Sequence, residues 1–294
     1  MQTMDEIIEP IQIDPQTFLK QHQTLPALPS VITDIQNLIS DENASINDIA
    51  LIISTEPALV AQILKIVNSA YYSFPHEVVD VKLAVAYLGI HEVFRIVLSL
   101  SVLNSFQDES RTEFEEIWYH SIFTALCAKV LAQNYEPLID IGELWTAAIL
   151  HDVGKLVYLK FFPIHYRVLN RYCEENQCFF SHAEEFYNLP SSAYMGGLLC
   201  DHWKLPSKVK FAAEDHSLET LKTLKNETLQ DSFTRVICLS NYIAHLITDE
   251  YGIELKEKIT SAIMENLKLD ESDFLILMGK MSELRVEAEK IVLG

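Results

Sequence analysis

The sequence is poor in the residues that make tight turns. Its 294 residues include only 8 Gly and 10 Pro, while 49% of them are hydrophobic. Folds built from many short strands need frequent turns, so this composition disfavours them and favours long helices. No alternation of apolar and polar residues is long enough to outweigh the helical periodicity of the chain. We therefore expect an all-α fold, in a chain long enough to bury a sizeable core.

Long hydrophobic runs are also missing. The best candidate for a membrane span, residues 93–103, contains Arg95 and falls short of the roughly 18 to 20 apolar residues that a bilayer requires. The first fourteen residues contain acidic side chains but no Lys or Arg, the reverse of the charged start of a secretion signal. We expect a cytoplasmic protein without a membrane span.

The sequence also lacks closely spaced cysteine pairs and has few basic residues. The five cysteines are an odd number and include no Cys-x-x-Cys pair. A disulfide framework or a thiolate zinc site is therefore not expected, and the thiols are predicted to be free and mostly buried. Lys and Arg total 22 against 42 Asp and Glu, which gives a net charge of −20. Because this charge repels a phosphate backbone, we expect no nucleic-acid partner.

The chain divides into three segments. Residues 1–15 are acidic, contain two prolines and show no clear period, so we expect a loosely docked tail. Residues 16–110 contain several amphipathic helical patterns, and one of them, residues 91–106, is apolar around nearly its whole circumference. That pattern predicts a central helix buried by its neighbours. Residues 111–294 hold a second helical set, whose final apolar stripe is expected to pack on its own domain.

The segment LWTAAILHDVGKLVYLK, residues 144–160, places His151 and Asp152 in an apolar setting. Adjacent positions on a regular helix point about 100° apart, so both can reach one ion only where the helix ends or distorts. We expect that end at Gly154, since glycine is common just past a helix C-terminus. Lys155 would then either neutralise Asp152 or lie on the surface. Alternatively, the doublet is a hydrogen-bonded buried pair that holds no ion.

Several separated motifs follow one another along the chain. They are the double-proline opening LPALP, the segment TEPALVAQILKIVNSAYYS, the helix end LAVAYLG, and the later elements HS, HDVGKL and WKLP. Over roughly residues 20–250, they together resemble the HDOD family, the HD-related output domains of bacterial signalling proteins. The resemblance implies a multi-helical N-terminal half packed on a degenerate HD-type helical core. It also implies a signalling or regulatory role, commonly without demonstrated catalysis.

The resemblance also implies a set of metal ligands. In active HD enzymes a first His, the His-Asp doublet and a distant Asp bind a divalent metal that activates water against a phosphate ester. His120 matches the first His, and His151 with Asp152 match the doublet. Asn241 stands where the last Asp is expected. Because Asn offers a neutral carbonyl in place of a carboxylate, affinity for a metal such as Mn, Fe, Zn or Mg should fall.

Other positions depart from the family pattern as well. Ser192 stands where many members have a further His, and Asp215 with His216 where they have a His-His doublet. A two-metal site would thus lack several ligands, and His216 is only a weak candidate. If the site were active, Lys155 and Asp152 would lie near the activated water.

Two functions remain open at this point. The first is a non-catalytic signalling protein that binds a protein partner or a small nucleotide-like ligand. The second is a metal-dependent phosphohydrolase or cyclic-nucleotide phosphodiesterase. The histidine cluster could also persist without an ion, because a fully satisfied hydrogen-bond network specifies a fold by itself. His245, on the helical face of Asn241, is expected to be packed or solvent-tipped, and Asn68 and Ser69 to close their helix by hydrogen bonds.

Overall fold

The computed structural model describes residues 28–40, 45–69, 71–107, 111–225, 227–249 and 251–293. These residues form helices joined by short connections and contain no strand, which confirms the all-α prediction. The predicted tail at residues 1–15 and the start of the double-proline motif lie outside the described residues. Both expected segment boundaries also fall on residues that are not described, so they stay predictions.

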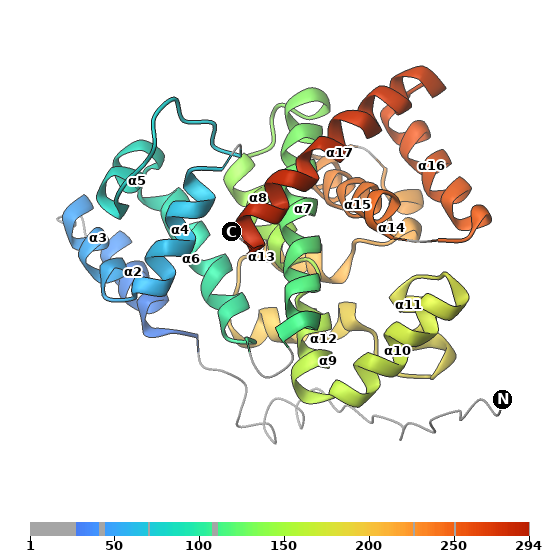
Figure 1. The fold of residues 1–294 in the computed structure, drawn as a ribbon, viewed down its shortest axis with the longest axis horizontal. Helices are drawn as coiled ribbons and strands as arrows, with labels where there is room; N and C mark the ends of the chain where they lie inside the picture. Colours follow the sequence, from blue (N-terminus) through green and yellow to red (C-terminus); the bar gives the residue numbers. More distant parts are fainter. Residues whose placement is uncertain are drawn as a thin grey trace.

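The N-terminal helices lie together on one side of the molecule (Figure 1). They are α2 (Ser30–Ile39), α3 (Ile46–Ser54), α4 (Pro57–Val67), α5 (Val81–Leu88) and α6 (Ile90–Asn104). Ser45 and Asp48 start α3 with a reciprocal capping box. Gly89, between α5 and α6, has φ 83°, which glycine adopts without strain. Helix α6 is buried from Ile96 to Leu103, as its uniformly apolar sequence predicts.

The second group of helices is arranged around a long helix that runs through the middle of Figure 1. Its members are α7 (Arg111–Tyr135), α8 (Ile141–Leu150), α9 (Val153–Phe161), α10 (Pro163–Asn176), α11 (Phe180–Phe186), α12 (Ser192–His202), α13 (Ser207–Glu214), α14 (Leu218–Thr223), α15 (Leu229–Thr248), α16 (Ile253–Leu267) and α17 (Glu271–Leu293). Helix α7 packs against α8, α15 and α17. Along α17, Leu277, Met281 and Ala288 are buried, so the apolar stripe contacts the chain itself.

No single helix among the described residues is long and apolar enough to cross a membrane. Helices α3 and α4 reach that length and composition only as a pair bent by 120°.

One hydrophobic core joins the two groups of helices. The ring of Tyr71, from the segment after α4, lies 4.4 Å from that of Trp145 in α8, measured between centroids. Its hydroxyl donates to the backbone carbonyl of Ile141 at 2.9 Å. Arg95 of α6 forms an ion pair of 3.0 Å with Asp140, the N-cap of α8. Tyr71, in the segment TEPALVAQILKIVNSAYYS, and Arg95 thus help to hold the N-terminal helices against α8.

Asn68 fixes the connection that follows α4. Its Nδ2 donates to the carbonyl of Val78 at 2.9 Å, and its Oδ1 accepts from the N–H of Val78 at 2.7 Å. Ser69 Oγ donates to the carbonyl of Ile66 at 2.6 Å. The bond of Ser69 closes α4 as predicted, whereas the bonds of Asn68 hold the connection after the helix instead of the helix end.

The helical run at residues 144–160 breaks at the doublet itself. Helix α8 ends at Leu150, His151 is its C-cap, and Asp152 is the N-cap of α9 with φ −98° and ψ 17°. The predicted helix end at Gly154 was therefore wrong, because Gly154 is the second residue of α9. The break turns the two adjacent side chains toward one site.

Gly154 instead allows two helices to approach closely. A Cβ at this position would collide with the backbone of Ser192 and would lie 2.9 Å from the backbone nitrogen of Gly196 in α12. Glycine on both sides of this contact brings α9 against α12, next to the doublet. The cost of glycine inside α12 is thus explained by close packing.

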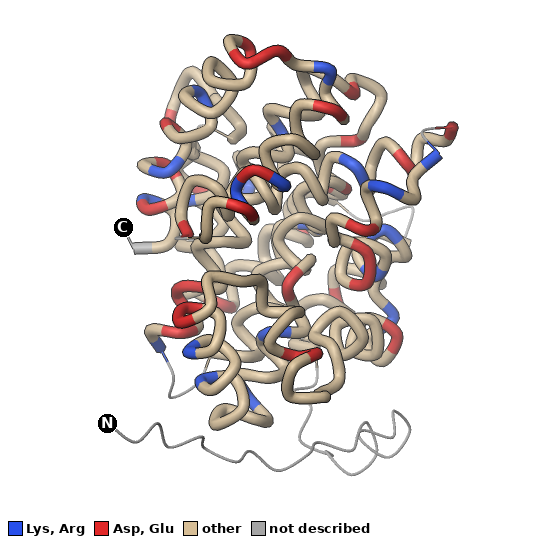
Figure 2. Tube along the Cα trace, turned by 90° about the vertical axis from the view of Figure 1, so that its right-hand side faces the viewer, with Lys and Arg blue, Asp and Glu red and all other residues tan. Residues whose placement is uncertain are grey.

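Acidic and basic residues are interspersed on the surface. In the side view of Figure 2, Lys and Arg positions lie singly or in small groups among those of Asp and Glu. Some are paired, as Lys210 is with Asp201 at 2.7 Å. The absence of a nucleic-acid partner stays a prediction.

Candidate metal centre and its pocket

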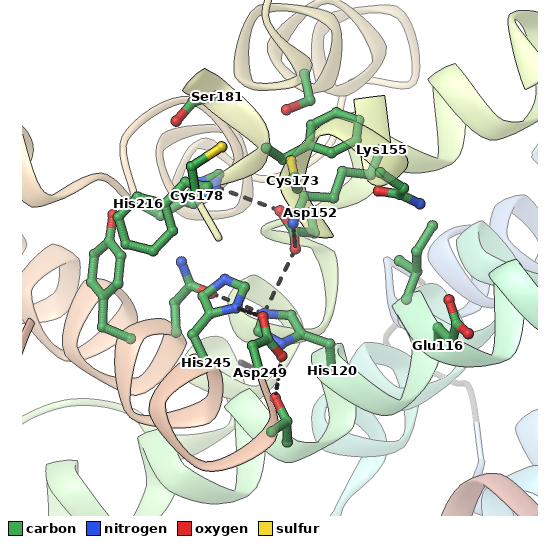
Figure 3. A pocket seen from close by; sticks show the side chains of 18 of the residues that line it. Glu116, His120, Asp152, Lys155, Cys173, Cys178, Ser181, His216, His245 and Asp249 are labelled. Atoms are coloured by element: carbon green, nitrogen blue, oxygen red, sulfur yellow. Dashed lines mark hydrogen bonds and ion pairs between the residues drawn. The ribbon is translucent and has the colours of Figure 1, made fainter. Parts of the chain in front are cut away.

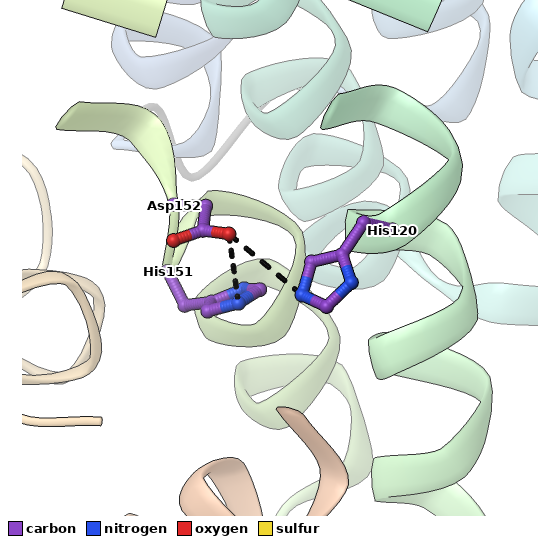
Figure 4. Close-up of side chains that lie close together, drawn as sticks. All are labelled: His120, His151 and Asp152. Carbon is purple, nitrogen blue, oxygen red and sulfur yellow. Dashed lines mark ion pairs between the residues drawn. The ribbon is translucent and has the colours of Figure 1, made fainter. Parts of the chain in front are cut away.

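Four side chains converge where α8 gives way to α9. His120 comes from α7, His151 and Asp152 from the break, and Asn241 from α15. Oδ1 of Asn241 lies 2.9 Å from Nε2 of His120 and 3.3 Å from Nε2 of His151. Oδ2 of Asp152 lies 3.7 Å from His120 Nε2 and 3.5 Å from His151 Nε2, as Figure 4 shows. The structure thus brings these predicted residues together.

Three of these side chains could hold a metal ion. One ligand atom from each of His120, His151 and Asp152 lies within 4.8 Å of the other two. His151 Nδ1 faces the carbonyl of Ala148 at 2.7 Å. A proton donated there leaves the Nε2 lone pair directed at the site, as in many metal-binding histidines. Imidazole nitrogens with one carboxylate oxygen suit Zn, Fe or Mn, and Asn241 could add a neutral oxygen.

The protonation states of the cluster also suit ligation. Burial lowers the pKa of His120 well below its usual value, and it lowers the pKa of His151. Burial opposes ionisation of Asp152, but Lys155 and the nearby histidines outweigh it and hold the pKa of Asp152 well below its usual range. Neutral imidazoles and an ionised carboxylate are the forms that bind a metal.

Lys155 neutralises the carboxylate of the doublet. Its Nζ lies 2.7 Å from Oδ2 of Asp152. Burial opposes the charged ammonium, but the attraction of Asp152 prevails and raises the pKa of Lys155. Of the two alternatives for Lys155, the structure shows the ion pair. The ammonium binds the same oxygen that faces His120 and His151, so a metal would compete with it for that charge.

His216 reaches the doublet from the connection between α13 and α14. Its Nδ1 faces the carbonyl of Ala212 at 2.8 Å, and its Nε2 lies 3.5 Å from Oδ1 of Asp152. Burial lowers the pKa of His216 to about 4. His216 therefore approaches Oδ1 of Asp152, whereas His120 and His151 face Oδ2.

His245 is packed against His120, as one of its two expected alternatives, and it also lines the pocket beside the cluster. Its ring centroid lies 4.4 Å from that of His120, and its Nδ1 lies 2.7 Å from Oδ2 of Asp249. The hydroxyl of Tyr251 donates to the same oxygen at 2.9 Å. Burial opposes ionisation of Asp249, but His245 and the hydrogen bonds lower its pKa. Asp249 follows His245 by four residues, a spacing that brings helical side chains together, so the sequence could have indicated the pair of His245 and Asp249.

Glu184 is a second buried carboxyl that no motif marked. It is 2% exposed, lies in α11 and accepts a hydrogen bond of 2.6 Å from the backbone N–H of Ser192. Burial raises the pKa of Glu184 to about 7. The contacting N–H belongs to α12, so the sequence around Glu184 carried no signal of this contact.

A pocket of about 910 Å³ opens onto these residues (Figure 3). Its volume lies within the roughly 300 to 1,000 Å³ of small-molecule sites. Aromatic residues form part of its wall, namely Tyr119, Tyr166, Phe179, Phe180, Tyr242 and Tyr251. Seven acidic residues line it against the two cations Lys155 and Arg285. The acids are Glu116, Asp152, Glu174, Glu184, Glu214, Asp249 and Glu289.

Comparison with solved structures shows the same fold in several bacterial proteins. An HDOD domain protein of unknown function from Geobacter sulfurreducens is 20% identical with a TM-score of 0.70, over 95% of this chain and 97% of that one. A candidate metal-dependent phosphohydrolase from Shewanella amazonensis is 20% identical with a TM-score of 0.68, over 94% and 98%. A candidate signal transduction protein from Marinobacter aquaeolei is 21% identical with a TM-score of 0.65, over 96% and 62%. At these identities the likeness establishes the fold alone.

Sequence comparison supplies the family. An uncharacterized protein of Treponema pallidum is 27% identical over 188 residues, which are 63% of this chain but only 36% of that protein. The chain thus spans about a third of this relative's length. The model of the HDOD domain matches residues 25–218. This match covers most of the chain and includes His120, His151 and Asp152, and the chain therefore belongs to the HDOD family.

Proposed function

We propose that this HDOD protein is a regulatory protein that binds a small ligand in the pocket beside His151 and Asp152 and does not hydrolyse phosphoesters. The observation that carries the proposal is the ion pair between Lys155 and Asp152 at 2.7 Å. Asp152 is the one carboxylate of the converging set, and Asn241 adds no charge. A divalent cation would find a donor set whose negative charge is already balanced.

The charge of the pocket supports the same proposal. Asp152 is paired with Lys155 and the pKa of Glu184 is raised to about 7, but the other five acidic residues of the lining still outnumber Arg285 and repel an anionic phosphoester. Arg285 is the one arginine among the described lining residues. A nucleotide-like ligand would have to enter together with a cation, and a neutral or cationic ligand would not. The lining residues hold and orient such a ligand through aromatic faces and carboxyl groups.

The alternative function is a metal-dependent phosphohydrolase. It is favoured by the convergence of His120, His151 and Asp152, whose ligand atoms lie within 4.8 Å of one another. A metal held there would supply Lewis-acid activation of water and phosphate. In that case His120 and His151 would present lone pairs, while Lys155 would hold Asp152 ionised.

The two functions are separated by restoring the missing carboxylate. We expect the purified native protein to hold less than one equivalent of Mn, Fe, Zn or Mg and to turn over no cyclic or linear phosphodiester. Asn241→Asp should bind Mn²⁺ about tenfold tighter or more, because affinity follows the number of charged ligands. Elemental analysis, calorimetric titration with Mn²⁺ and a phosphodiesterase screen are the measurements.

The matched control is Asn134→Asp, which adds the same charge at an exposed position of α7. It should leave Mn²⁺ affinity unchanged. A native protein with stoichiometric metal and phosphoester turnover that His151→Ala abolishes would overturn the proposal in favour of the phosphohydrolase.

A further inference from the structure

Cys173 and Cys178 lie next to each other on the wall of the pocket. Both residues line the pocket and both are partly exposed. Each thiol is a hydrogen-bond neighbour of the other. Figure 3 shows them between Ser181 and Lys155. All five thiols are free and three of them, Cys127, Cys200 and Cys238, are buried, which confirms the expectation of free, mostly buried thiols; Cys173 and Cys178 are the two that are not buried.

The end of α10 brings the two thiols together. Gln177 adopts the left-handed conformation, with φ 50° and ψ 49°, and ends the helix. The backbone N–H of Cys178 then donates to the carbonyl of Cys173 at 3.2 Å. In this helix ending the two residues joined by that hydrogen bond also commonly bring their side chains into contact. The backbone therefore holds the thiols as a pair although four residues separate them in the sequence.

We propose that Cys173 and Cys178 are a redox site of this protein, which forms an intramolecular disulfide by exchange with a low-molecular-weight disulfide. One cysteine, as thiolate, attacks a sulfur of the small disulfide and releases one small thiol. The second cysteine attacks the mixed disulfide and releases the other. The pair is oxidised, the small disulfide is reduced, and the two cysteine protons pass to the two released thiols. The inference is independent of the proposed function.

The local environment predicts a slow reaction at neutral pH. Burial raises the pKa of Cys173 to about 12, and burial also raises the pKa of Cys178. Since the thiolate is the attacking form, the exchange rate should rise about tenfold per pH unit in the alkaline range.

A bond between these thiols would hold one wall of the pocket. Cys178 is followed directly by Phe179 and Phe180. The Phe179 ring lies 6.0 Å from that of His245, between centroids, and Lys155 Nζ lies 5.7 Å from the centroid of Phe180. The disulfide would tie the end of α10 to the start of α11, and these aromatic contacts with it.

The test uses the full chain, first reduced and then incubated with oxidised glutathione at pH 8.5. Intact mass and peptide mapping should show one disulfide between Cys173 and Cys178, no retained glutathione, and full reversal by dithiothreitol. Cys173→Ser and Cys178→Ser should each stop at the mixed disulfide and retain one glutathione. Cys200→Ala is the control and should form the bond as the native chain does. Far-UV circular dichroism establishes that each variant is folded.

Hydrogen exchange gives a second readout that does not depend on substitutions. Oxidation should slow exchange in residues 177–187 of the native chain and leave α2–α6 unchanged. Two glutathiones retained on the native protein, a bond involving Cys127, Cys200 or Cys238, or no reaction at pH 8.5 would each overturn the inference.

Discussion

At the scale of single residues, the site depends on how burial is balanced by partners. Asp152 is buried and ionised because Lys155 lies 2.7 Å away. Glu184 is equally buried, but its hydrogen-bond partner is the neutral Ser192, through the backbone N–H and the side chain. Both carboxyls line one pocket, yet their pKa values shift in opposite directions. The difference is the presence of a cation beside one of them.

The raised pKa of Glu184 predicts a dependence of stability on pH. It rises from 4.5 to about 7 on folding, so between these values the folded state binds more protons than the unfolded state. Stability from this group is therefore present at pH 4.5 and is lost as the pH rises through 7, by roughly 3 kcal/mol. Glu184→Gln should be nearly neutral at pH 5 and stabilising by up to about 3 kcal/mol at pH 8.

Urea denaturation of native protein and variant at the two pH values measures this effect. Glu185→Gln, at the exposed neighbouring position, is the control and should leave the difference between the pH values unchanged. Equal effects of Glu184→Gln at both pH values would show that the carboxyl is ionised throughout.

At the scale of helices, close contact between α9 and α12 determines where the doublet lies. Gly154 lies against the backbone of α12, whereas Gly279 of α17 has no heavy atom within 4 Å of an added Cβ. The same substitution should therefore act in opposite directions at these two helical positions. Backbone atoms cannot move aside as a flexible side chain can.

We expect Gly154→Ala to lower the free energy of unfolding by about 3 kcal/mol or more, because α9 and α12 must separate. Gly279→Ala should raise it by about 1 kcal/mol, because alanine favours the helix and meets open space. Chemical denaturation measures both. A neutral Gly154→Ala would refute the close contact, and the gain at Gly279 serves as the internal control.

At the scale of the whole molecule, a shared core should make the two groups of helices unfold together. The tryptophans, Trp118, Trp145 and Trp203, all lie in the second group. Their fluorescence therefore reports that group, while far-UV circular dichroism reports all helices. Tyr71 and Arg95 contact α8 or its cap across the junction.

Ile53→Ala tests this coupling from the far side of the junction. Ile53 is fully buried in α3, so its truncation should cost about 2–5 kcal/mol. The tryptophan and circular dichroism transitions should shift together to lower urea. Leu51→Ala, at a position 70% exposed on the same helix, should shift them by less than about 0.5 kcal/mol. A shift seen by circular dichroism alone would mean that the groups unfold separately.

The sequence alone determined the fold class, the family and the main members of the candidate site. Helical periodicity and caps such as Ser45 with Asp48 are local, so they could be read without tertiary contacts. The motif order identified His120, His151, Asp152 and the substituted position Asn241. These features could be predicted because each depends on residues within a short stretch of the chain.

Only the tertiary structure decided how these residues act on one another. The helix breaks at His151 rather than at Gly154, which instead packs α9 against α12. The raised pKa of Glu184 comes from its burial in the folded chain. The meeting of His245 with His120 joins α15 to α7, which are distant along the chain. Burial and charge depend on neighbours in space, and the pKa values follow from both.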